Sequence, residues 1–332
     1  MPQSPPLRIG YVPEHFSTPL HFARTHFSAK FTLHPFPSGT GHMITSLSAN
    51  EIDIGIGLTE AWVSGLAKAE TEDRPAPYAL VGTYVESPLR WAISTGGSRK
   101  DIGVNADPGE WVKELRGRKM GVSRVGSGSY VMGFVVADKM GWLTTAAAAA
   151  AVGGAEEERR QQQPFEVVPL QTFEKLREGV NSEGGAAGAA DFFMWEHFTS
   201  KRYFDNGEIR KIGEILTPWP SWHVVAKPEL VGDERLEEFF TLVDQGVVWF
   251  AGHGDEAVEY ISTELDYSKE DAEEWMRTVQ FAKEVKGVRR SVVDETLTVL
   301  KKAGVVEEGV KGEEMMKIRR KEPGLLIALT GS

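Results

Sequence analysis

Short apolar runs alternate with helix-length amphipathic segments in the N-terminal part of the chain. Apolar side chains at helical spacing, such as Met43, Ile44 and Leu47, mark the helices, whereas the run at residues 52–57 is short and nearly continuous. Strands that alternate with helices of about ten residues pair in parallel, so this pattern predicts an α/β domain. It predicts strands at 7–12, 31–36 and 52–57, and helices at 21–31, 39–49 and 59–69.

Two apolar segments in the middle of the chain are too long for single strands, which have about five or six residues. Residues 78–94 bend near Glu86-Ser87-Pro88, and residues 211–226 bend near Trp219–His223. We interpret each segment as a crossing between two lobes. After Pro228 the capping residues and apolar stripes predict helices at 233–250, 255–265, 268–279 and 291–303.

Residues 144–163 differ in composition from the rest of the chain. They contain an alanine run at 146–151 and a glutamine run at 161–163. Low complexity of this kind is typical of a surface segment outside the packed core. We interpret it as an insertion without a functional role.

Composition and charge exclude several classes of function. The chain has 332 residues, enough for two lobes, and a net charge of −11, which argues against a nucleic-acid partner. It has no cysteine, so disulfides and thiolate metal sites are excluded. No secretory signal and no apolar run near the ~18 residues of a membrane span is visible. We therefore expect a cytoplasmic protein that does not bind membranes.

The most informative motif is the turn Gly126-Ser127-Gly128-Ser129, which joins a predicted strand to an apolar helix. Free N–H groups at a helix start, together with serine hydroxyls, can hold an anion. An ordinary strand-to-helix turn is the alternative. A dinucleotide-binding motif needs glycine at the position of Val131, and a nucleophile elbow needs glycine at that of Val125. No P-loop lysine follows the turn either, so these three motifs are excluded.

Other candidate ligand contacts lie where predicted strands end, because ligands of open α/β sheets bind outside those ends. For the polar candidates the alternative is a turn or a helix cap, and for the aromatic ones it is the core. The candidates besides Ser127, Gly128 and Ser129 are Tyr11, His15, Phe16, Ser38, Gly39, Thr40, Thr59, Glu60, Trp195, Trp219 and Trp222.

Neither histidines nor carboxylates predict a reactive centre. No pair of histidines has the spacing that places two metal ligands on one helix face, so no metal site is expected. Glu14, Glu60 and Glu196 have no spacing that makes them converge, and a carboxylate repels an anionic ligand. We expect helix-end and surface roles for these three residues, and no catalytic residue.

The order of these motifs resembles the periplasmic-binding-protein-like type II superfamily. The resemblance rests on Gly10-Tyr11 in the opening strand, the segment 47–55, the segment 115–122 before the Gly-Ser turn, and the strand that runs from Asp191 to Trp195-Glu196. It is nearest to the alkanesulfonate-, taurine- and nitrate-binding proteins and the thiamine-pyrimidine-precursor proteins. It implies mixed or parallel sheets with helices on both faces, in two lobes that close on a ligand by a hinge. Lobe one would be 1–86 and 220–332, and lobe two 87–219.

The function implied is binding of a small molecule with a sulfonate, carboxylate or phosphate group, without a cofactor. The absence of a signal and the Ala and Gln tracts suggest an intracellular fungal member. One alternative is an enzyme of thiamine-pyrimidine or related metabolism, with a lysine bound to pyridoxal phosphate; the cysteine-rich motif of that branch is missing here. Another is an intracellular ligand sensor, for which the sequence names no protein partner.

Overall fold

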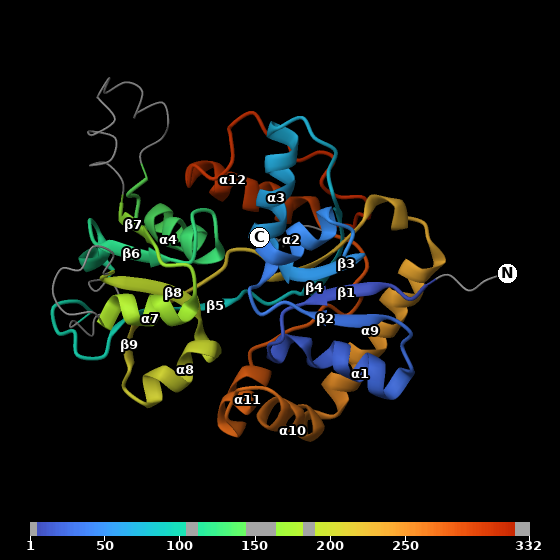
Figure 1. Cartoon of the computed structure of the whole chain (residues 1–332), viewed down its shortest axis with the longest axis horizontal. Coiled ribbons are helices and arrows are strands. Elements are labelled where there is room, and N and C mark those ends of the chain that lie inside the picture. The colour runs from blue at the N-terminus through green and yellow to red at the C-terminus, as the bar shows by residue number, and fades with distance from the viewer. Residues whose placement is uncertain (1–4, 104–111, 144–163, 182–189, 323–332) are drawn as a thin grey trace, which may run out of the picture.

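The chain forms two α/β lobes, each built around a five-stranded sheet (Figure 1). The structure is a computed structural model that describes residues 5–103, 112–143, 164–181 and 190–322. The predicted insertion at 144–163 lies outside these residues. So does the first part of residues 108–115, where the cap residue Asp107 and Pro108 predict a short helix. No helix in the part that is described has the length and apolarity to cross a bilayer.

The sheet of the first lobe has the order β2-β1-β3-β10-β4. The first three strands are parallel, and β10 is antiparallel to β3 and β4. Figure 1 shows α2 and α3 over one face of this sheet and α1 and α9 over the other. The elements are β1 (Arg8–Tyr11), η1 (His15–Ser17), α1 (Thr18–Phe27), β2 (Thr32–Pro35), α2 (Thr40–Ser48), β3 (Ile54–Leu58), α3 (Thr59–Thr71), β4 (Ala79–Val85), β10 (Trp222–Ala226), η3 (Pro228–Leu230), α9 (Glu234–Gly252), α10 (Gly254–Glu264), α11 (Lys269–Met276) and α12 (Arg290–Lys302).

The sheet of the second lobe has the order β7-β6-β8-β5-β9. Here β6 is parallel to β7 and β8, whereas β5 is antiparallel to β8 and β9. The predicted α/β fold with mixed sheets is thus confirmed. The elements are β5 (Arg90–Gly96), η2 (Lys113–Leu115), β6 (Lys119–Val122), α4 (Gly128–Lys139), β7 (Glu166–Pro169), α7 (Phe173–Asn181), β8 (Phe192–Glu196), α8 (His197–Asp205) and β9 (Ile209–Leu216).

The chain passes between the two sheets twice, once between β4 and β5 and once between β9 and β10. Each long apolar segment of the sequence is therefore two strands, one in each lobe. The two crossings are hydrogen-bonded to each other: Leu89 N donates to Thr217 Oγ1 at 2.9 Å, and Ser221 Oγ donates to Ser87 O at 2.7 Å. These bonds hold the two connecting segments side by side.

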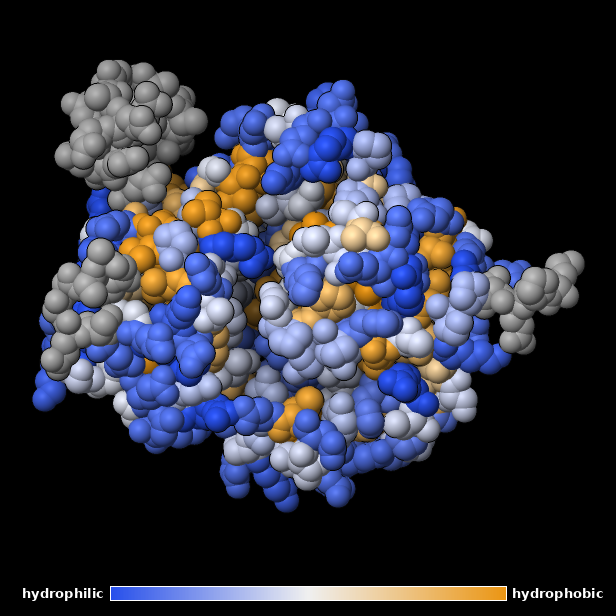
Figure 2. All heavy atoms as spheres, in the orientation of Figure 1, coloured by the Kyte–Doolittle hydropathy of each residue, from blue (hydrophilic) through white to orange (hydrophobic). Residues whose placement is uncertain are grey.

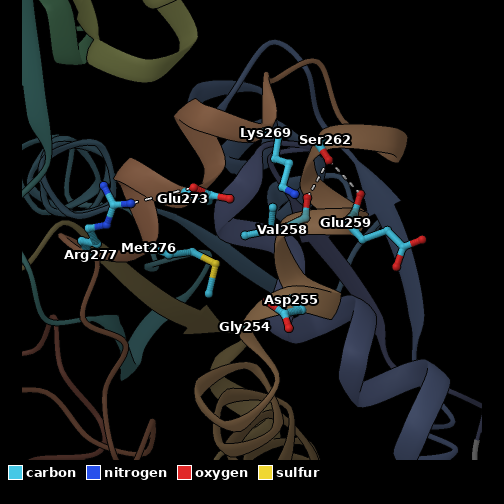
Figure 3. A pocket seen from close by; sticks show the side chains of 9 residues that line it. All are labelled: Gly254, Asp255, Val258, Glu259, Ser262, Lys269, Glu273, Met276 and Arg277. Carbon is cyan, nitrogen blue, oxygen red and sulfur yellow. Dashed lines mark hydrogen bonds and ion pairs between the residues drawn. The ribbon is translucent and has the colours of Figure 1, made fainter.

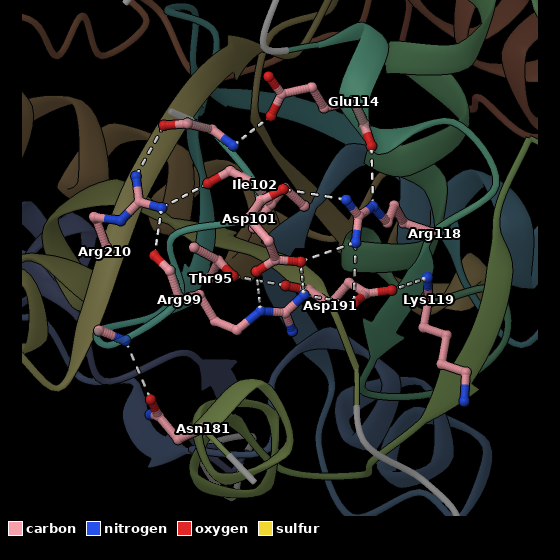
Figure 4. Close-up of polar contacts among 12 residues, drawn as sticks. Thr95, Arg99, Asp101, Ile102, Glu114, Arg118, Lys119, Asn181, Asp191 and Arg210 are labelled. Atoms are coloured by element: carbon pink, nitrogen blue, oxygen red, sulfur yellow. Dashed lines mark hydrogen bonds and ion pairs between the residues drawn. The ribbon is translucent and has the colours of Figure 1, made fainter. Parts of the chain in front are cut away.

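Each lobe anchors its central strand through an aspartate that directly precedes it. Asp53, before β3, accepts a bond from Arg8 N at 2.9 Å and pairs with the Arg8 guanidinium at 2.8 Å. Asp191, before β8, accepts from Lys119 N at 2.9 Å and pairs with Arg99 at 2.8 Å (Figure 4). In both lobes this aspartate contact fixes the register between the central strand and its neighbour. The opposite ends of these strands face the other lobe.

Candidate functional site

A cavity of about 320 Å³ lies between the two lobes, in the hollow that separates them in Figure 2. Pockets of this volume and larger hold small organic ligands. Eight of the predicted contacts line this cavity, and six of them are polar residues or glycines at turns and helix starts of both lobes. They are Ser38, Gly39, Thr40, Ser127, Gly128, Ser129, Trp195 and Trp222.

The start of α4 forms one wall of the cavity. Ser127 is the N-cap residue, and its Oγ accepts from Tyr130 N at 3.4 Å and lies 2.9 Å from Ser129 Oγ. Ser129 Oγ in turn accepts from Ser123 N at 3.2 Å. The bond between the two hydroxyls uses one of their two protons, so the other can be donated to a ligand. The N–H groups of Gly128 and Ser129, at the free end of the helix, add two further donors.

The start of α2 lies across the cavity in the first lobe. Thr40 opens this helix after Gly39, and Thr40 Oγ1 accepts from Leu58 N at 2.9 Å. Arg124, from the loop before α4, reaches over to this helix, so that a side chain at Gly41 would collide with its guanidinium. Desolvation lowers the pKa of Arg124, and no carboxylate of the described chain pairs with it. Two helix N-termini and an unpaired guanidinium thus border one cavity.

Arg124 was not among the contacts predicted from the sequence. It stands inside the Gly-Ser turn segment, two residues before Gly126, but its reach depends on how the other lobe is placed. Trp91 and Phe173 line the cavity as well and were also missed. Phe173 stacks on Trp195 with ring centroids 4.9 Å apart, and the Trp91 ring lies against Gly128. Aromatic rings therefore make up much of the remaining wall.

The carboxyl groups do not have the surface roles expected of them. Glu60 and Glu196 are 1% and 6% exposed, and Glu14 and Glu196 line the cavity. Burial raises the pKa of Glu60 and of Glu196 to about 7 each, and that of Glu14 to about 8, with repulsion from Glu196 adding to it. The expected helix-end role is confirmed for Glu196, whose Oε2 accepts from Thr199 N at the start of α8 at 2.6 Å.

Six predicted contacts lie away from the cavity lining. His15 and Phe16 belong to η1, which directs them into an aromatic cluster: the His15 ring lies 4.5 Å from Tyr267 and 4.3 Å from Trp275. Tyr11 is half-buried and packs against the core. The remaining three hold the crossing segment in place.

These three are Thr59, Glu60 and Trp219. Thr59 is the first residue of α3 and makes no cap bond; its hydroxyl donates to Pro220 O at 2.5 Å. Trp219 is buried and donates from Nε1 to Glu60 Oε2 at 3.1 Å. Glu60 and Trp219 thus bind each other and Thr59 binds Pro220, because the second crossing folds back onto α3.

A second hollow of about 550 Å³ lies between α10 and α11, within the first lobe (Figure 3). Some of its polar groups bind one another: Ser262 donates to Val258 O at 2.8 Å, and Arg277 pairs with Glu273 at 3.8 Å. This hollow lies within one lobe and has no helix start of the other lobe in its wall, unlike the interlobe cavity. Within the described ranges no group of three His, Asp or Glu side chains is arranged to hold a metal ion.

The chain and its fold are similar to known proteins throughout their length. The product of the Candida albicans CA3427 gene, described as defining a new family with the periplasmic binding protein fold, is 38% identical. The match covers 97% of this chain and 100% of that one, with a TM-score of 0.78. The model of Ca3427-like periplasmic binding proteins matches residues 91–215. This chain belongs to the Ca3427-like family.

More distant structures share the fold of this family. The alkanesulfonate-binding protein SsuA of Xanthomonas axonopodis pv. citri, bound to MOPS, is 13% identical, with a TM-score of 0.65 and coverage of 93% of this chain and 97% of that one. The nitrate-binding protein NrtA of Synechocystis is 14% identical, with a TM-score of 0.63 and coverage of 92% and 83%. No protein of curated function matches the chain. The predicted type II periplasmic-binding-protein fold is thus confirmed.

Proposed function

We propose that this Ca3427-like protein binds a small organic anion in the interlobe cavity and closes its lobes around it. The observation that carries this proposal is the unpaired Arg124 guanidinium beside the starts of α2 and α4. An arginine fork and free helix N–H groups are strong ligands for a sulfonate, carboxylate or phosphate. The distant structural relatives include an alkanesulfonate-binding and a nitrate-binding protein, which supports an anion as the ligand.

Closure would be a hinge motion about the two hydrogen-bonded crossings. The two lobes contact each other at two places: Lys201 pairs with Asp271 at 3.3 Å, and Tyr130 Oη donates to Ala303 O at 3.2 Å. We assign residues up to 86 and from 220 onward to lobe one, and residues 87–219 to lobe two. A ligand held by Arg124 and the start of α2 would bridge the lobes and favour this arrangement.

The experiment is isothermal titration calorimetry with MOPS and ethanesulfonate. We expect saturable binding that weakens at least about tenfold in Arg124→Gln, since one charged hydrogen-bonding group is worth that much or more. Ser127→Ala combined with Ser129→Ala should weaken it several-fold. Arg277→Gln, at an exposed arginine in the other hollow, is the matched control and should bind as the wild type does. Binding that is equal in all four proteins would refute the site.

The alternative of an enzyme with lysine-bound pyridoxal phosphate finds less support. The residues that line the described cavity include no lysine. An absorbance band of an internal aldimine in the purified protein would nevertheless favour it. An intracellular sensor remains compatible with the same hinge, and a pulldown with and without the bound sulfonate would detect its partner. The similarity to a Candida albicans protein supports a fungal member.

A further inference from the structure

The charges around the interlobe cavity are separated. Arg124 has no acidic partner, and Glu14 and Glu196 have no basic partner within ion-pair distance in the described part of the chain. Glu14 is repelled by Glu196, whereas the positive charge that acts on Glu196 is that of Arg90. Arg124 is not among the principal charges that act on either carboxyl. The cavity therefore has a cationic wall and a separate acidic wall.

Three buried polar atoms in or behind the walls of this cavity also lack hydrogen-bond partners in the described part of the chain. They are Nε1 of Trp91 and Nε1 of Trp222, which line the cavity, and Oε1 of Glu60, which lies behind Gly128. Glu60 Oε1 points at Gly128: a Cβ there would lie 3.0 Å from this oxygen. Buried polar groups in native proteins are nearly always bonded, and unsatisfied ones need an explanation. A ligand that carries both donors and acceptors provides one.

We propose that the ligand is a zwitterion, with its anionic group at Arg124 and the start of α4 and a protonated nitrogen between Glu14 and Glu196. This inference rests on the proposed anion site and adds a second subsite to it. A cation between the two carboxylates removes their repulsion and offsets the cost of their desolvation. An anion in that place would do neither. Trp195 and Trp222 also line the cavity, and aromatic rings attract such a cation.

The size and walls of the cavity further limit the class of ligand. A volume of about 320 Å³ exceeds that of a two-carbon aminosulfonate and accommodates a ring. The stacked pair Phe173 and Trp195 presents a flat apolar surface for it. The ligand class is thus a ring-bearing amine or nitrogen heterocycle with an acidic side chain.

The test compares two sulfonates that differ in one group. Cyclohexylaminopropanesulfonate carries a protonated amine at neutral pH, and cyclohexylbutanesulfonate has a methylene in its place. Affinities are measured by calorimetry for the wild type, Glu14→Gln, Glu196→Gln and the double variant. Glu14→Gln removes no hydrogen bond found in the structure, and glutamine at 196 keeps an oxygen for Thr199 N, so both variants should fold. Glu273→Gln, in the hollow between α10 and α11, is the control.

We expect the amine to bind the wild type at least about tenfold more tightly, and this advantage to fall below about threefold in the double variant. Affinity for the neutral-tailed sulfonate should stay the same or rise, and Glu273→Gln should change neither. Equal binding of the two sulfonates to the wild type, or an advantage that survives in the double variant, would overturn the zwitterion while leaving the anion site intact. Failure of both sulfonates to bind would overturn the anion site itself.

Discussion

Trp219 Nε1 donates a hydrogen bond to Glu60 Oε2 at 3.1 Å, and both side chains are almost fully buried. The bond ties the second crossing to the start of α3. It also fixes the other oxygen of Glu60 toward Gly128 at the start of α4. A single carboxyl group thus contacts the first lobe, the crossing and the second lobe at the edge of the ligand cavity.

Replacing this carboxyl by an amide should stabilise the protein at high pH. Burial raises the pKa of Glu60 to about 7 from 4.5, so its contribution to stability is present at acid pH and is lost as the pH rises through 7. Glu60→Gln keeps an acceptor for Trp219 and avoids this loss. We expect a gain in the free energy of unfolding on the order of 2 kcal/mol near pH 8 and little change near pH 5.

Urea denaturation at both pH values measures the effect, and Trp219→Phe serves as a companion variant. Removing the indole donor leaves Glu60 Oε2 without its partner, so that variant should be less stable at both pH values, by about 1–3 kcal/mol. A Glu60→Gln protein whose stability relative to the wild type is the same at both pH values would contradict the argument.

Adding one methyl group at Gly128 should disturb the contact between the lobes. A Cβ there would lie 2.9 Å from Trp91 Cη2 and 3.0 Å from Glu60 Oε1. Gly128→Ala should therefore hold the lobes further apart, lower sulfonate affinity about tenfold or more, and increase the radius of gyration measured by X-ray scattering. Gly252→Ala is the control, because nothing lies within 4 Å of its added Cβ. Unchanged affinity and radius would count against a closed arrangement of this geometry.

His15 should limit stability at acid pH. Both of its ring nitrogens are buried without a partner, and burial lowers its pKa well below 6.5. The unfolded chain binds a proton there as the pH falls below about 6 and the folded protein does not, so stability is lost. His15→Phe keeps the aromatic packing and should stabilise the protein by about 1–2 kcal/mol or more near pH 5. Thermal unfolding over this pH range measures the effect, and His42→Phe, at an exposed position, is the control. A His15→Phe protein that is no more stable than the wild type near pH 5 would contradict this prediction.

Loss of the aspartate that anchors β8 should destabilise the second lobe. Asp191 accepts from Lys119 N at 2.9 Å and pairs with Arg99 at 2.8 Å, in a partly buried setting. Asp191→Asn removes one carboxylate partner of Arg99 and should lower the free energy of unfolding by about 2–3 kcal/mol. Asp205→Asn, at an exposed ion pair of the same lobe, should cost less than about 1 kcal/mol. Equal losses in the free energy of unfolding for the two variants would contradict the proposed role of Asp191.

Local sequence patterns predicted most of the helices and strands because each depends on neighbouring residues. The start of α4 is an example: Ser127 caps the helix, and the apolar run behind it buries that helix. The segments at 78–94 and 211–226 were predicted to cross between two lobes, and each divides into strands of two different sheets. The local pattern did not predict that β10 and β5 run antiparallel to their neighbours, because the chain returns there from the other lobe.

Placement of single side chains was predicted less well. His15 and Phe16 follow the first strand as cleft residues would, but η1 turns them toward Tyr267 and Trp275, which lie far away in the sequence. Glu14 and Glu196 had no spacing that relates them, yet they face one cavity. Both line it because β1 and β8, two strands of different lobes, end at the same cavity.

The sequence by itself determined the two-lobed α/β fold, the Gly-Ser turn at the start of α4 and the family resemblance, since these follow from local periodicity, capping and turn chemistry. Only the tertiary structure decided which residues share the cavity. Arg124 meets the start of α2, and Glu60 meets Trp219 and Gly128, through the relative position of two lobes joined by two crossings. That position is set by packing across the whole chain, and with it the charges that a ligand must satisfy.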